Sequence, residues 1–372
     1  MRDVLIIAGE ASGDLHGAGV AERLRAVRPD VPLVGMGGER MAAAGVRLFE
    51  QAEGVVGFVE VLKHLPAHVR LLNTVKRMLR SGRVGLVILI DYPGFNLRVA
   101  EAAKAAGVPV LYYITPQVWA WKPGRLKMMA EVITKAAVIL PFEEKLLRDA
   151  GIDTTFVGHP LLDRAVSLAD RAEARRRIGI DGDGDVLALF PGSRAQEIER
   201  HVPSFAAVAQ ELQRRRPGLK VVVSVAPTIR LDESHFPYPM VRAQSFDVLR
   251  AADVALCKSG TTTLEAAVAG CPCAVVYKTS AITYWIAKQL VSIPHIGLLN
   301  VVAGREVAPE FVQGAFTTTA VANALEPLFD AASPARAKMV QGMAEIRRSL
   351  GEPGAASRVA DMAATMIAPV ER

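Results

Sequence analysis

The sequence predicts an α/β protein of two doubly wound, Rossmann-like domains with parallel sheets, facing a central cleft. Three observations support this prediction. At 372 residues the chain is longer than one typical domain. Short, almost uninterrupted apolar runs alternate with helical patterns, as in parallel sheets covered by helices on both faces. Polar or glycine-containing turns follow several runs, and such folds bind ligands at the carboxyl ends of their strands.

The apolar runs fall into two groups, separated by a polar, charged segment over 163–177. Helical periodicity continues from 334 to 366. We therefore expect an N-terminal domain over 1–165, a C-terminal domain over 166–345, and a helix over 346–372 that packs back on the first domain. The expected strands are 4–8, 31–34, 86–90, 108–113, 136–140 and 155–157, then 186–190, 220–225, 254–256 and 273–277.

Composition narrows the class of protein. Hydrophobic residues make up 51% of the chain and charged residues 22%, which is typical of a folded, core-rich protein. The formal net charge of +6 suits an anionic partner such as a nucleotide, a phosphorylated lipid or an acidic membrane surface. Because no basic tail or aromatic-interleaved basic run occurs, we do not expect nucleic acid to be a partner.

The apolar runs and the cysteines also bear on location. The first apolar run ends at Glu10, which indicates a strand rather than a secretory signal. No run approaches the ~18 residues that cross a bilayer. The three cysteines, Cys257, Cys271 and Cys273, fit neither a metal site nor a disulfide framework, so we expect them in the core. These features predict a cytoplasmic protein.

The stretch from 254 to 265 indicates a nucleotide site. It predicts a buried strand, a turn of small residues and a helix that begins near Thr261. The N–H groups and positive dipole of a helix start favour a phosphate, here at Ser259, Gly260, Thr261 and Thr262. Glu265, about one helical turn further on, is placed to accept hydrogen bonds from ribose hydroxyls. An ordinary capped strand–turn–helix fits the same pattern.

A second turn, Pro191-Gly192-Ser193-Arg194, follows the expected strand at 186–190. Beside this small-residue turn, Ser193 and the guanidinium of Arg194 could stabilise a diphosphate leaving group. A surface arginine near a turn is the alternative. Asn300 and Arg305 form another polar cluster and are candidates for contact with phosphate or sugar.

The turn after the first strand, Gly9-Glu10-Ala11-Ser12-Gly13-Asp14, lacks the G-x-G-x-x-G spacing of a dinucleotide fold. Its carboxylates would repel a pyrophosphate, so Glu10, Ser12 and Asp14 suit hydroxyl or amide groups. His16, just inside the following helix, could reach the same site. Alternatively, Ser12 or Asp14 only caps that helix.

Asp91 is the main candidate for a catalytic base. It ends the apolar strand at 86–90 and precedes the pair Pro93-Gly94. Removal from water at a strand end raises the pKa of a carboxyl group and makes it a better base near neutral pH. The alternative is that Asp91 caps the helix that starts after Pro93.

Two further segments have two interpretations each. Gln117, Trp119 and Trp121 follow the strand at 108–113 and suit a sugar face or an acyl chain, although a structural tryptophan pair is equally consistent. Between Phe58 and Arg83, apolar residues recur at near-helical spacing beside lysines and arginines. Such a pattern is typical of a helix at an anionic membrane surface, but also of an amphipathic helix packed on a core.

The acidic run Asp181-Gly182-Asp183-Gly184-Asp185 does not indicate a metal site. A calcium loop of the EF-hand type needs glycine at its sixth position and glutamate at its twelfth, where this chain has Val186 and Gly192. We expect a solvated turn, no metal ligands and no cofactor.

Taken in order, these motifs resemble the lipid-A-disaccharide synthase family of glycosyltransferases, which has the GT-B fold. Two positions depart from the family pattern. Gly94 stands where the family often has a second aspartate, so Asp91 is the carboxylate that matches the family pattern. Thr115 stands where serine is common, and it keeps the hydroxyl group. The resemblance covers nearly the whole chain, through the segments 9–14, 91–96, 116–121, 158–160, 191–194, 259–265 and 300–306.

The resemblance implies an inverting transferase of lipid A and lipopolysaccharide biosynthesis. It would condense UDP-2,3-diacylglucosamine with 2,3-diacylglucosamine 1-phosphate, giving the β-1,6-linked disaccharide 1-phosphate and UDP. Asp91, or His16 in its place, would act as the base. The N-terminal domain would bind the acceptor and the C-terminal domain the UDP-sugar. The acceptor-binding residues would be Glu10, Ser12, Asp14, Gln117, Trp119 and Trp121. The enzyme would work on the inner face of a Gram-negative inner membrane, held there by the region from Phe58 to Arg83. A homodimer is one assembly consistent with this function.

Two other functions fit the residues. Another GT-B enzyme that uses a UDP-sugar would need a different first turn, typically glycine-rich with histidine, and no acyl chains on its donor. A non-catalytic nucleotide-binding protein at a membrane surface would bind UDP or vesicles, yet it would release no UDP from a sugar donor.

Overall fold

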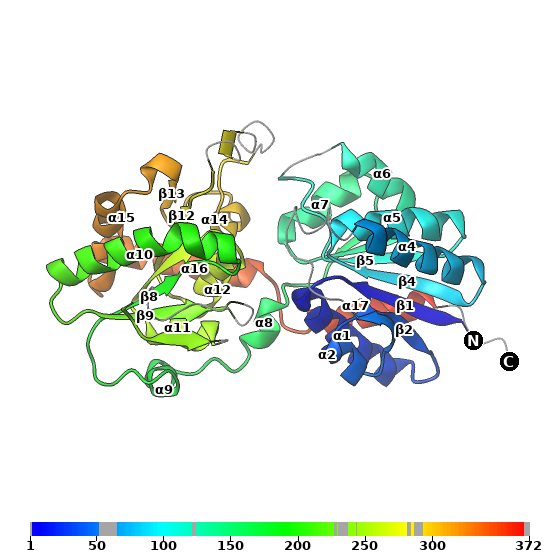
Figure 1. Ribbon diagram of the computed structural model, residues 1–372, viewed down its shortest axis with the longest axis horizontal. Coiled ribbons are helices and arrows are strands. Elements are labelled where there is room, and N and C mark those ends of the chain that lie inside the picture. Colours follow the sequence, from blue (N-terminus) through cyan, green and yellow to red (C-terminus); the bar gives the residue numbers. More distant parts are fainter. Residues whose placement is uncertain are drawn as a thin grey trace. The chain divides into compact units, whose positions relative to one another are not determined.

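Two units of parallel sheet and helix make up the computed structural model (Figure 1). Unit 1 comprises Met1–Asp163 and Gly351–Arg372, and unit 2 comprises Arg164–Leu350. The structure describes residues 2–51, 65–120, 124–226, 229, 237–242, 244–280, 284–285 and 293–367. Each unit has its own parallel sheet, which confirms the predicted α/β class.

The sheet of unit 1 has seven strands in the order β3-β2-β1-β4-β5-β6-β7. Almost all residues of the central strands β1 and β4 are buried, because helices cover both faces. The strands are β1 (Asp3–Ala8), β2 (Leu33–Gly37), β3 (Arg47–Gln51), β4 (Val84–Ile90), β5 (Val110–Tyr113), β6 (Lys135–Val138) and β7 (Thr154–Phe156).

Alternate residues of these strands point to two separate apolar cores. Leu5 and Ile7 of β1 belong to one core, and Val4 and Ile6 belong to the other. The first core lies under α4 (Leu65–Arg80), α5 (Pro93–Ala105), α6 (Arg125–Val132) and α7 (Pro141–Asp149). The second lies under α1 (Ala11–Val27), α2 (Glu39–Ala43) and α17 (Ala355–Met366).

The chain returns to unit 1 at its C-terminal end. Helix α17 packs along α1, as Figure 1 shows in red and dark blue. Its residues Val359, Ala360 and Ala363 are buried in the core on this side of the sheet. Arg358 also donates from Nε to the carbonyl of Val157, at 2.8 Å. Unit 1 is therefore completed by residues from both ends of the chain.

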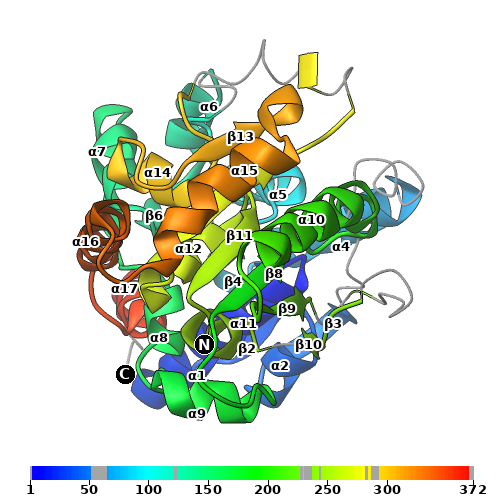
Figure 2. The ribbon, with the colours of Figure 1, turned by 90° about the vertical axis from the view of Figure 1, so that its left-hand side faces the viewer.

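The sheet of unit 2 has six strands in the order β10-β9-β8-β11-β12-β13. Helix α10 (Ala195–Arg215) packs with α15 (Thr318–Leu325), and Figure 2 shows the two side by side. Helix α12 (Thr261–Ala269) packs with α11 (Ser245–Ala251), α14 (Leu298–Ala303) and α16 (Pro334–Ser349). The strands are β8 (Val186–Phe190), β9 (Lys220–Val225), β10 (Met240–Arg242), β11 (Val254–Lys258), β12 (Cys273–Tyr277) and β13 (Glu310–Val312).

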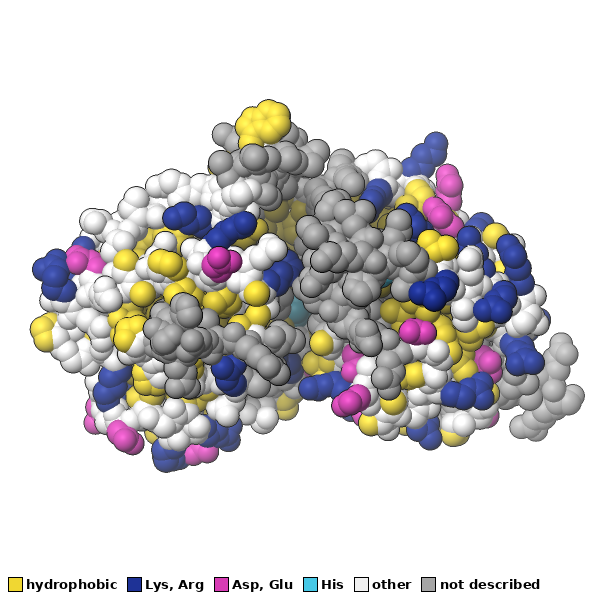
Figure 3. Space-filling view, viewed as in Figure 1, with side chains coloured by type: hydrophobic (Ala, Val, Ile, Leu, Met, Phe, Trp, Pro, Cys, Tyr) yellow, Lys and Arg dark blue, Asp and Glu magenta, His cyan; other side chains and the backbone are white. Residues whose placement is uncertain are grey.

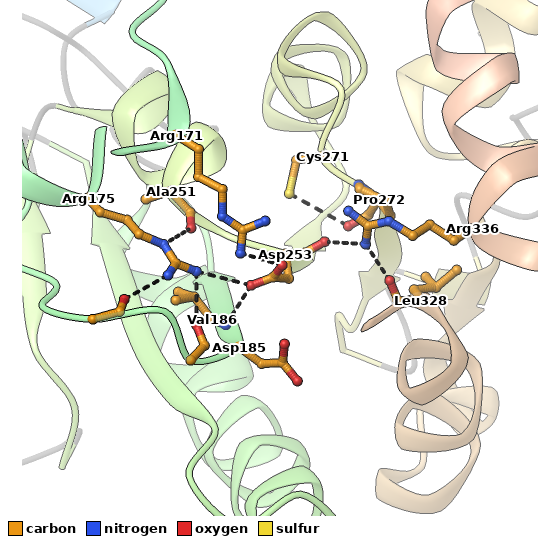
Figure 4. A network of polar contacts seen from close by, with 12 residues as sticks. Arg171, Arg175, Asp185, Val186, Ala251, Asp253, Cys271, Pro272, Leu328 and Arg336 are labelled. Atoms are coloured by element: carbon orange, nitrogen blue, oxygen red, sulfur yellow. Dashed lines mark hydrogen bonds and ion pairs between the residues drawn. The ribbon is translucent and has the colours of Figure 1, made fainter. Parts of the chain in front are cut away.

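A buried carboxylate ties the start of unit 2 to its sheet (Figure 4). Asp253, 6% exposed, accepts hydrogen bonds from Arg171 at 2.5 Å, Arg175 at 3.3 Å and the N–H of Val186 at 2.9 Å. Both arginines belong to α9 (Arg171–Arg177), and Arg336 of α16 donates to the carbonyl of Asp253 at 3.0 Å. One aspartate thus joins a helix, two strand ends and a second helix.

The same network explains the acidic run over 181–185. Arg175 donates to the carbonyls of Gly182 and Gly184, both at 2.9 Å, so the loop is held through its backbone. Asp185 pairs with Arg216 at 2.5 Å. These contacts give the run a structural role in unit 2.

Three strands of the structure were not expected from the sequence: β3, β10 and β13. All three lie at sheet edges. The residues of β10 and β13 are only partly buried or exposed, so these strands lack the apolar run that marks a central strand. The second strand also begins at Leu33, two residues later than expected.

Helix α4 covers the described part of the basic and apolar region. Its residues Val75 and Leu79 are buried in the core of unit 1, so the core-packed interpretation holds for them. Residues 58–64 of that region lie outside the described residues. Among the residues that the structure describes, no helix is long and apolar enough to cross a membrane.

Candidate active site

In unit 1, the turns after β1 and β4 lie next to each other at the carboxyl ends of these strands. These strands are neighbours, with Ala8 paired to Ile90, and the strand order reverses between them. Ligands of doubly wound folds bind at such a switch point, outside the carboxyl ends of the strands. Because Glu10 follows β1 and Asp91 follows β4, the fold brings the two predicted carboxylates to this point.

The backbone at Asp91 is held in an unusual conformation. Asp91 and Tyr92 both have φ of 48°, in the left-handed region that side chains rarely adopt. The carbonyl of Asp91 accepts hydrogen bonds from Asn96 Nδ2 at 2.7 Å and from the Tyr112 hydroxyl at 2.8 Å. The N-cap residue of α5 is Tyr92, so Asp91 does not cap this helix. Strain held by buried partners is characteristic of functional sites.

The protonation of Asp91 is shifted toward neutral pH. Burial raises the pKa of its carboxyl group to about 6, the negative charge of Glu10 adds to the rise, and a hydrogen bond from the Tyr92 N–H opposes it. Desolvation disfavours the charged form, which is the cause that the sequence suggested. A carboxylate with this pKa is a competent general base near pH 7.

Close packing fixes the turn beside Asp91. A Cβ atom on Gly9 would lie 2.3 Å from the Tyr92 ring, so only glycine fits between the end of β1 and this ring. The Tyr92 hydroxyl is 2.5 Å from Nε2 of His68 on α4. Tyr92 therefore links the two site turns to α4.

Asp14 has a structural role that the sequence did not suggest. Its carboxylate accepts hydrogen bonds from the N–H groups of Gly38 at 2.7 Å, Arg40 at 3.2 Å and Met41 at 3.0 Å. It thereby caps α2, not its own helix, and it is 7% exposed. Because three N–H groups already engage the carboxylate, this cap is the role that the structure shows for Asp14, and its contact with the acceptor sugar stays a prediction.

Glu10 and Ser12 stay on the accessible side of the same turn. Glu10 is the N-cap residue of α1 and is half-buried, while Ser12 is exposed in the first turn of that helix. His16 packs edge-on against Tyr113, with ring centroids 6.1 Å apart. Burial, with a smaller effect from His16, lowers the pKa of His159 to about 4, so His159 is neutral at physiological pH.

Trp119 is anchored by a buried glutamate. Its indole Nε1 donates to Oε1 of Glu143 at 2.9 Å, and its ring packs edge-on against Phe142, with centroids 5.0 Å apart. Burial raises the pKa of Glu143 to about 7, against the effect of the Trp119 hydrogen bond. Gln117 is exposed nearby, and Trp121 lies outside the described residues. For Trp119, these contacts agree with the structural alternative.

Unit 2 repeats the arrangement of unit 1. Its strand order reverses between β8 and β11, which pair through Phe190 and Cys257. The predicted diphosphate turn follows β8, and the predicted phosphate-binding helix start follows β11. The two candidate donor motifs, about 65 residues apart in the sequence, therefore lie at the switch point of one sheet.

The two turns differ in what they expose. The side chain of Arg194 is 60% exposed, and Ser193 precedes it after Gly192, whose φ is 137°. Gly260 is the N-cap residue of α12, with φ of 155°, and Thr261 and Thr262 begin this helix. Helix geometry leaves the N–H groups of the first turn without carbonyl partners inside the helix. The N–H of Thr263 donates to the carbonyl of Gly260 at 3.1 Å, so the N–H groups of Thr261 and Thr262 remain suitable donors for a phosphate.

Ser259 has a structural role. Its N–H donates to the carbonyl of Val276 at 2.9 Å, and its hydroxyl donates to the carbonyl of Ile296 at 2.6 Å. Both of its donor groups hold the loop against β12 and the segment before α14. Gly260, Thr261 and Thr262 are therefore the stronger phosphate candidates, and the contact of Ser259 with the donor stays a prediction.

Glu265 is held by an arginine that the sequence did not suggest. Arg164 Nη1 donates to Glu265 Oε1 at 2.8 Å, across 101 residues of sequence. Arg164 also reaches Ser245 Oγ at 3.3 Å and lies over the Phe246 ring, 5.0 Å from its centroid. Glu265 is 7% exposed, and one of its oxygens is thereby fixed before any ligand binds.

Asn300 has a structural role in unit 2, and its contact with the donor stays a prediction. It is fully buried, and its Nδ2 donates to the Ala308 carbonyl at 2.7 Å and to Glu310 at 2.8 Å. Its Oδ1 accepts from the N–H groups of Val307 and Ala308. Every hydrogen-bonding group of this side chain is thus used inside unit 2. Arg305, half-exposed, pairs with Glu345 at 2.6 Å.

Sequence comparison identifies the family. The profile of the lipid-A-disaccharide synthetase family matches residues 4–364. Lipid-A-disaccharide synthase from Myxococcus xanthus is 40% identical over 375 residues, which cover 98% of each chain. The enzyme of that name from Syntrophus aciditrophicus is 42% identical, over 98% of this chain and 97% of its own. The chain belongs to the lipid-A-disaccharide synthase family.

Solved structures of other proteins share the fold. The calicheamicin glycosyltransferase CalG4 aligns over all of both chains, with a TM-score of 0.60 and 17% identity. UDP-GlcNAc 2-epimerase from Neisseria meningitidis, bound to UDP-GlcNAc, aligns over 98% of this chain and 99% of its own, with a TM-score of 0.57 and 9% identity. The fold is therefore GT-B, and membership of the synthase family makes the protein a glycosyltransferase of lipid A biosynthesis.

Proposed function

We propose that the protein condenses UDP-2,3-diacylglucosamine with 2,3-diacylglucosamine 1-phosphate, releasing UDP and forming the β-1,6-linked disaccharide 1-phosphate. The observation that carries the proposal is the pair of switch points. One holds a carboxylate whose pKa is raised to about 6, and the other holds the arginine turn and helix start suited to a diphosphate. Family membership supports the lipid A chemistry.

The proposed chemistry is one displacement with inversion. Asp91 removes the proton from the 6-hydroxyl of the acceptor as this oxygen attacks C1 of the donor sugar. The bond from C1 to the diphosphate oxygen breaks, and UDP leaves with the electron pair. An α-linked donor then gives a β-linked product, with no covalent enzyme intermediate and an oxocarbenium-like transition state. His16 is the alternative base.

Unit 2 would stabilise the charge on the leaving UDP. Arg194 can form forked hydrogen bonds to the diphosphate, and the N–H groups of Thr261 and Thr262 at the start of α12 can donate to its oxygens. Glu265, fixed by Arg164, would accept hydrogen bonds from the ribose. Hydrogen-bond donors that are already in place where the negative charge of UDP develops lower the activation barrier, because the protein does not need to reorganise during the reaction.

The test is UDP release by the purified full-length protein in detergent micelles, with UDP-2,3-diacylglucosamine as donor. We expect release only when 2,3-diacylglucosamine 1-phosphate is also present, with equal rates in excess chelator and in Mg²⁺. Release without acceptor would point to a hydrolase. UDP binding with no release under either condition would favour a nucleotide-binding protein without transferase activity.

We also propose that the protein contacts an anionic membrane surface through unit 1. Arg70, Arg77 and Arg80 on α4, and Arg83 just beyond it, are exposed, and Figure 3 shows lysine and arginine side chains on this side of the unit. Each basic residue near an anionic surface contributes about 1 kcal/mol. We expect co-sedimentation with phosphatidylglycerol vesicles that is weakened by salt and by Arg77→Ser with Arg80→Ser. Binding that survives both would overturn an electrostatic contact.

A further inference from the structure

The diphosphate turn of unit 2 carries an internal anion. Lys258, the last residue of β11, places Nζ 2.7 Å from Oε1 of Glu197 on α10. The side chains of Lys258 and Glu197 are 16% and 13% exposed, so this ion pair is largely shielded from water. Each partner would be costly to bury alone.

The same carboxylate also contacts a backbone N–H group and a guanidinium group of the turn. Glu197 Oε2 accepts a hydrogen bond from the N–H of Ser193 at 3.1 Å, and Arg194 Nη1 is 3.8 Å from Oε1. The fit is tight, because a Cβ atom on Gly192 would lie 2.8 Å from Oε2. One carboxylate therefore contacts the N–H of Ser193, Lys258 and Arg194 together.

Glu197 is negatively charged in this position. Burial alone would raise the pKa of its carboxyl group, but the hydrogen bond and charge of Lys258, with the Ser193 N–H, lower it overall. The contacts of Glu197 are those that a phosphate oxygen makes at such a turn: a backbone N–H, an ammonium and a guanidinium.

We infer that Lys258 is an additional diphosphate-binding residue, and that Glu197 is an internal counter-ion that a bound diphosphate displaces from the N–H of Ser193 and from Lys258. This inference rests on the proposed function, which places UDP at the switch point of unit 2. In the absence of donor, Glu197 keeps Lys258 paired. When UDP binds, its phosphates take over these donors, and Glu197 opposes the binding.

An ordinary capping role for Glu197 predicts the opposite effect. Glu197 is the third residue of α10, where a glutamate commonly reaches back to an N–H before the helix. If it only organises the turn and holds Lys258 for the ligand, its removal should weaken anion binding. If it competes with the ligand, its removal should strengthen binding. The sign of the change separates the two roles.

The experiment is calorimetric titration of the full-length protein with UDP and, separately, with inorganic pyrophosphate. We expect Glu197→Gln to lower the Kd for both by about 3- to 30-fold, because a competing charge is removed. Lys258→Gln should raise both Kd values by a similar factor. Glu199→Gln, an exposed glutamate on the same helix, and Lys338→Gln, an exposed lysine on α16, are the matched charge controls and should change little.

An unchanged or higher Kd in Glu197→Gln, or an equal gain in Glu199→Gln, would overturn the inference. If wild-type protein binds pyrophosphate but not UDP, the proposed function fails while the pyrophosphate series still decides the inference. Binding of neither ligand by any variant would overturn both. Should Glu197→Gln not fold, the double variant with Lys258→Gln is compared with Lys258→Gln alone, and tighter pyrophosphate binding by the double variant is the expected result.

Discussion

At the scale of single residues, the site of unit 1 depends on how the backbone presents Asp91. Two consecutive left-handed residues turn the chain sharply after β4, and Asn96 and Tyr112 hold the Asp91 carbonyl in that turn. The carboxylate is thereby left beside Glu10 at the strand ends, where burial raises its pKa. Asn96 and Tyr112 thus hold the backbone of Asp91, whereas burial and the charge of Glu10 set the pKa of its carboxyl group.

Asp91→Asn should lower kcat by about 10²–10⁴-fold, because it removes the base. It should leave the affinity for UDP nearly unchanged, because Asp91 makes no proposed contact with the UDP-sugar. The wild-type rate should fall as the pH drops through about 6, where Asp91 becomes protonated. Pre-steady-state turnover and UDP calorimetry measure the two effects. Near-normal turnover in the variant would transfer the role to His16 or to solvent.

The same substitution should stabilise the protein. A folded-state pKa raised from 3.8 to about 6 means that stability from this group is lost as the pH rises from about 4 to about 6. At pH 7 the ionised Asp91 therefore costs about 1–3 kcal/mol, which asparagine avoids. Urea unfolding at pH 7 and at pH 4 should show a gain at pH 7 alone.

Gly94→Asp introduces the second carboxylate that the resemblance described above leads us to expect at this position. The position is exposed, and an added Cβ would meet no described atom within 4 Å, so the side chain fits. Its charge lies close to Asp91 and should move the acidic limb of the pH–rate profile upward by about half a unit to one unit. Gly94→Asn, which has the same shape without the charge, is the control and should leave the profile in place.

At the scale of elements, sequence patterns located the central strands and the edge strand β7, but they missed the edge strands β3, β10 and β13. The run over 186–190 is buried throughout, and its expected bounds agree with β8. In contrast, β13 has the sequence Glu-Phe-Val and is only partly buried, so no apolar run marks it. Pairing with β12 makes it a strand, and that pairing is a property of the assembled sheet.

Asp253→Asn should test how α9 is joined to the sheet of unit 2. Arg175 is about 9% exposed and would lose its buried counter-charge, so the variant should lose about 3–5 kcal/mol of stability. Urea unfolding, followed by circular dichroism, measures the loss. Glu173→Gln, in an exposed pair on the same helix, should change little; a similar loss there would contradict a burial effect.

At the scale of the whole molecule, the chain builds unit 1, then unit 2, and returns to unit 1 with α17. The returning helix supplies part of the core that covers one face of the first sheet. Unit 1 is therefore incomplete until the last residues have been added. The stability of unit 1 should therefore depend on residues of α17, which are about 200 positions away in the sequence from the rest of this unit.

Val359→Asp should destabilise unit 1 by roughly 2–5 kcal/mol, because it places a charge in the fully buried contact between α17 and α1. Hydrogen exchange should speed up in α1 and β1 more than in α10 and β8. Asp361→Ala, at an exposed position of the same helix, is the control. Equal acceleration in both units would argue against a local role for α17.

The sequence by itself determined the class of fold, the two central switch-point motifs and the family, because these depend on local runs and on short motifs. Only the tertiary structure decided which motif residues have side chains available to a ligand. Asp14, Ser259 and Asn300 have polar side chains in suitable motifs, yet their partners come from distant segments. The pairs Arg164–Glu265 and Lys258–Glu197 are equally invisible in sequence. Buried polar groups must find partners in the folded chain, and those partners are set by packing.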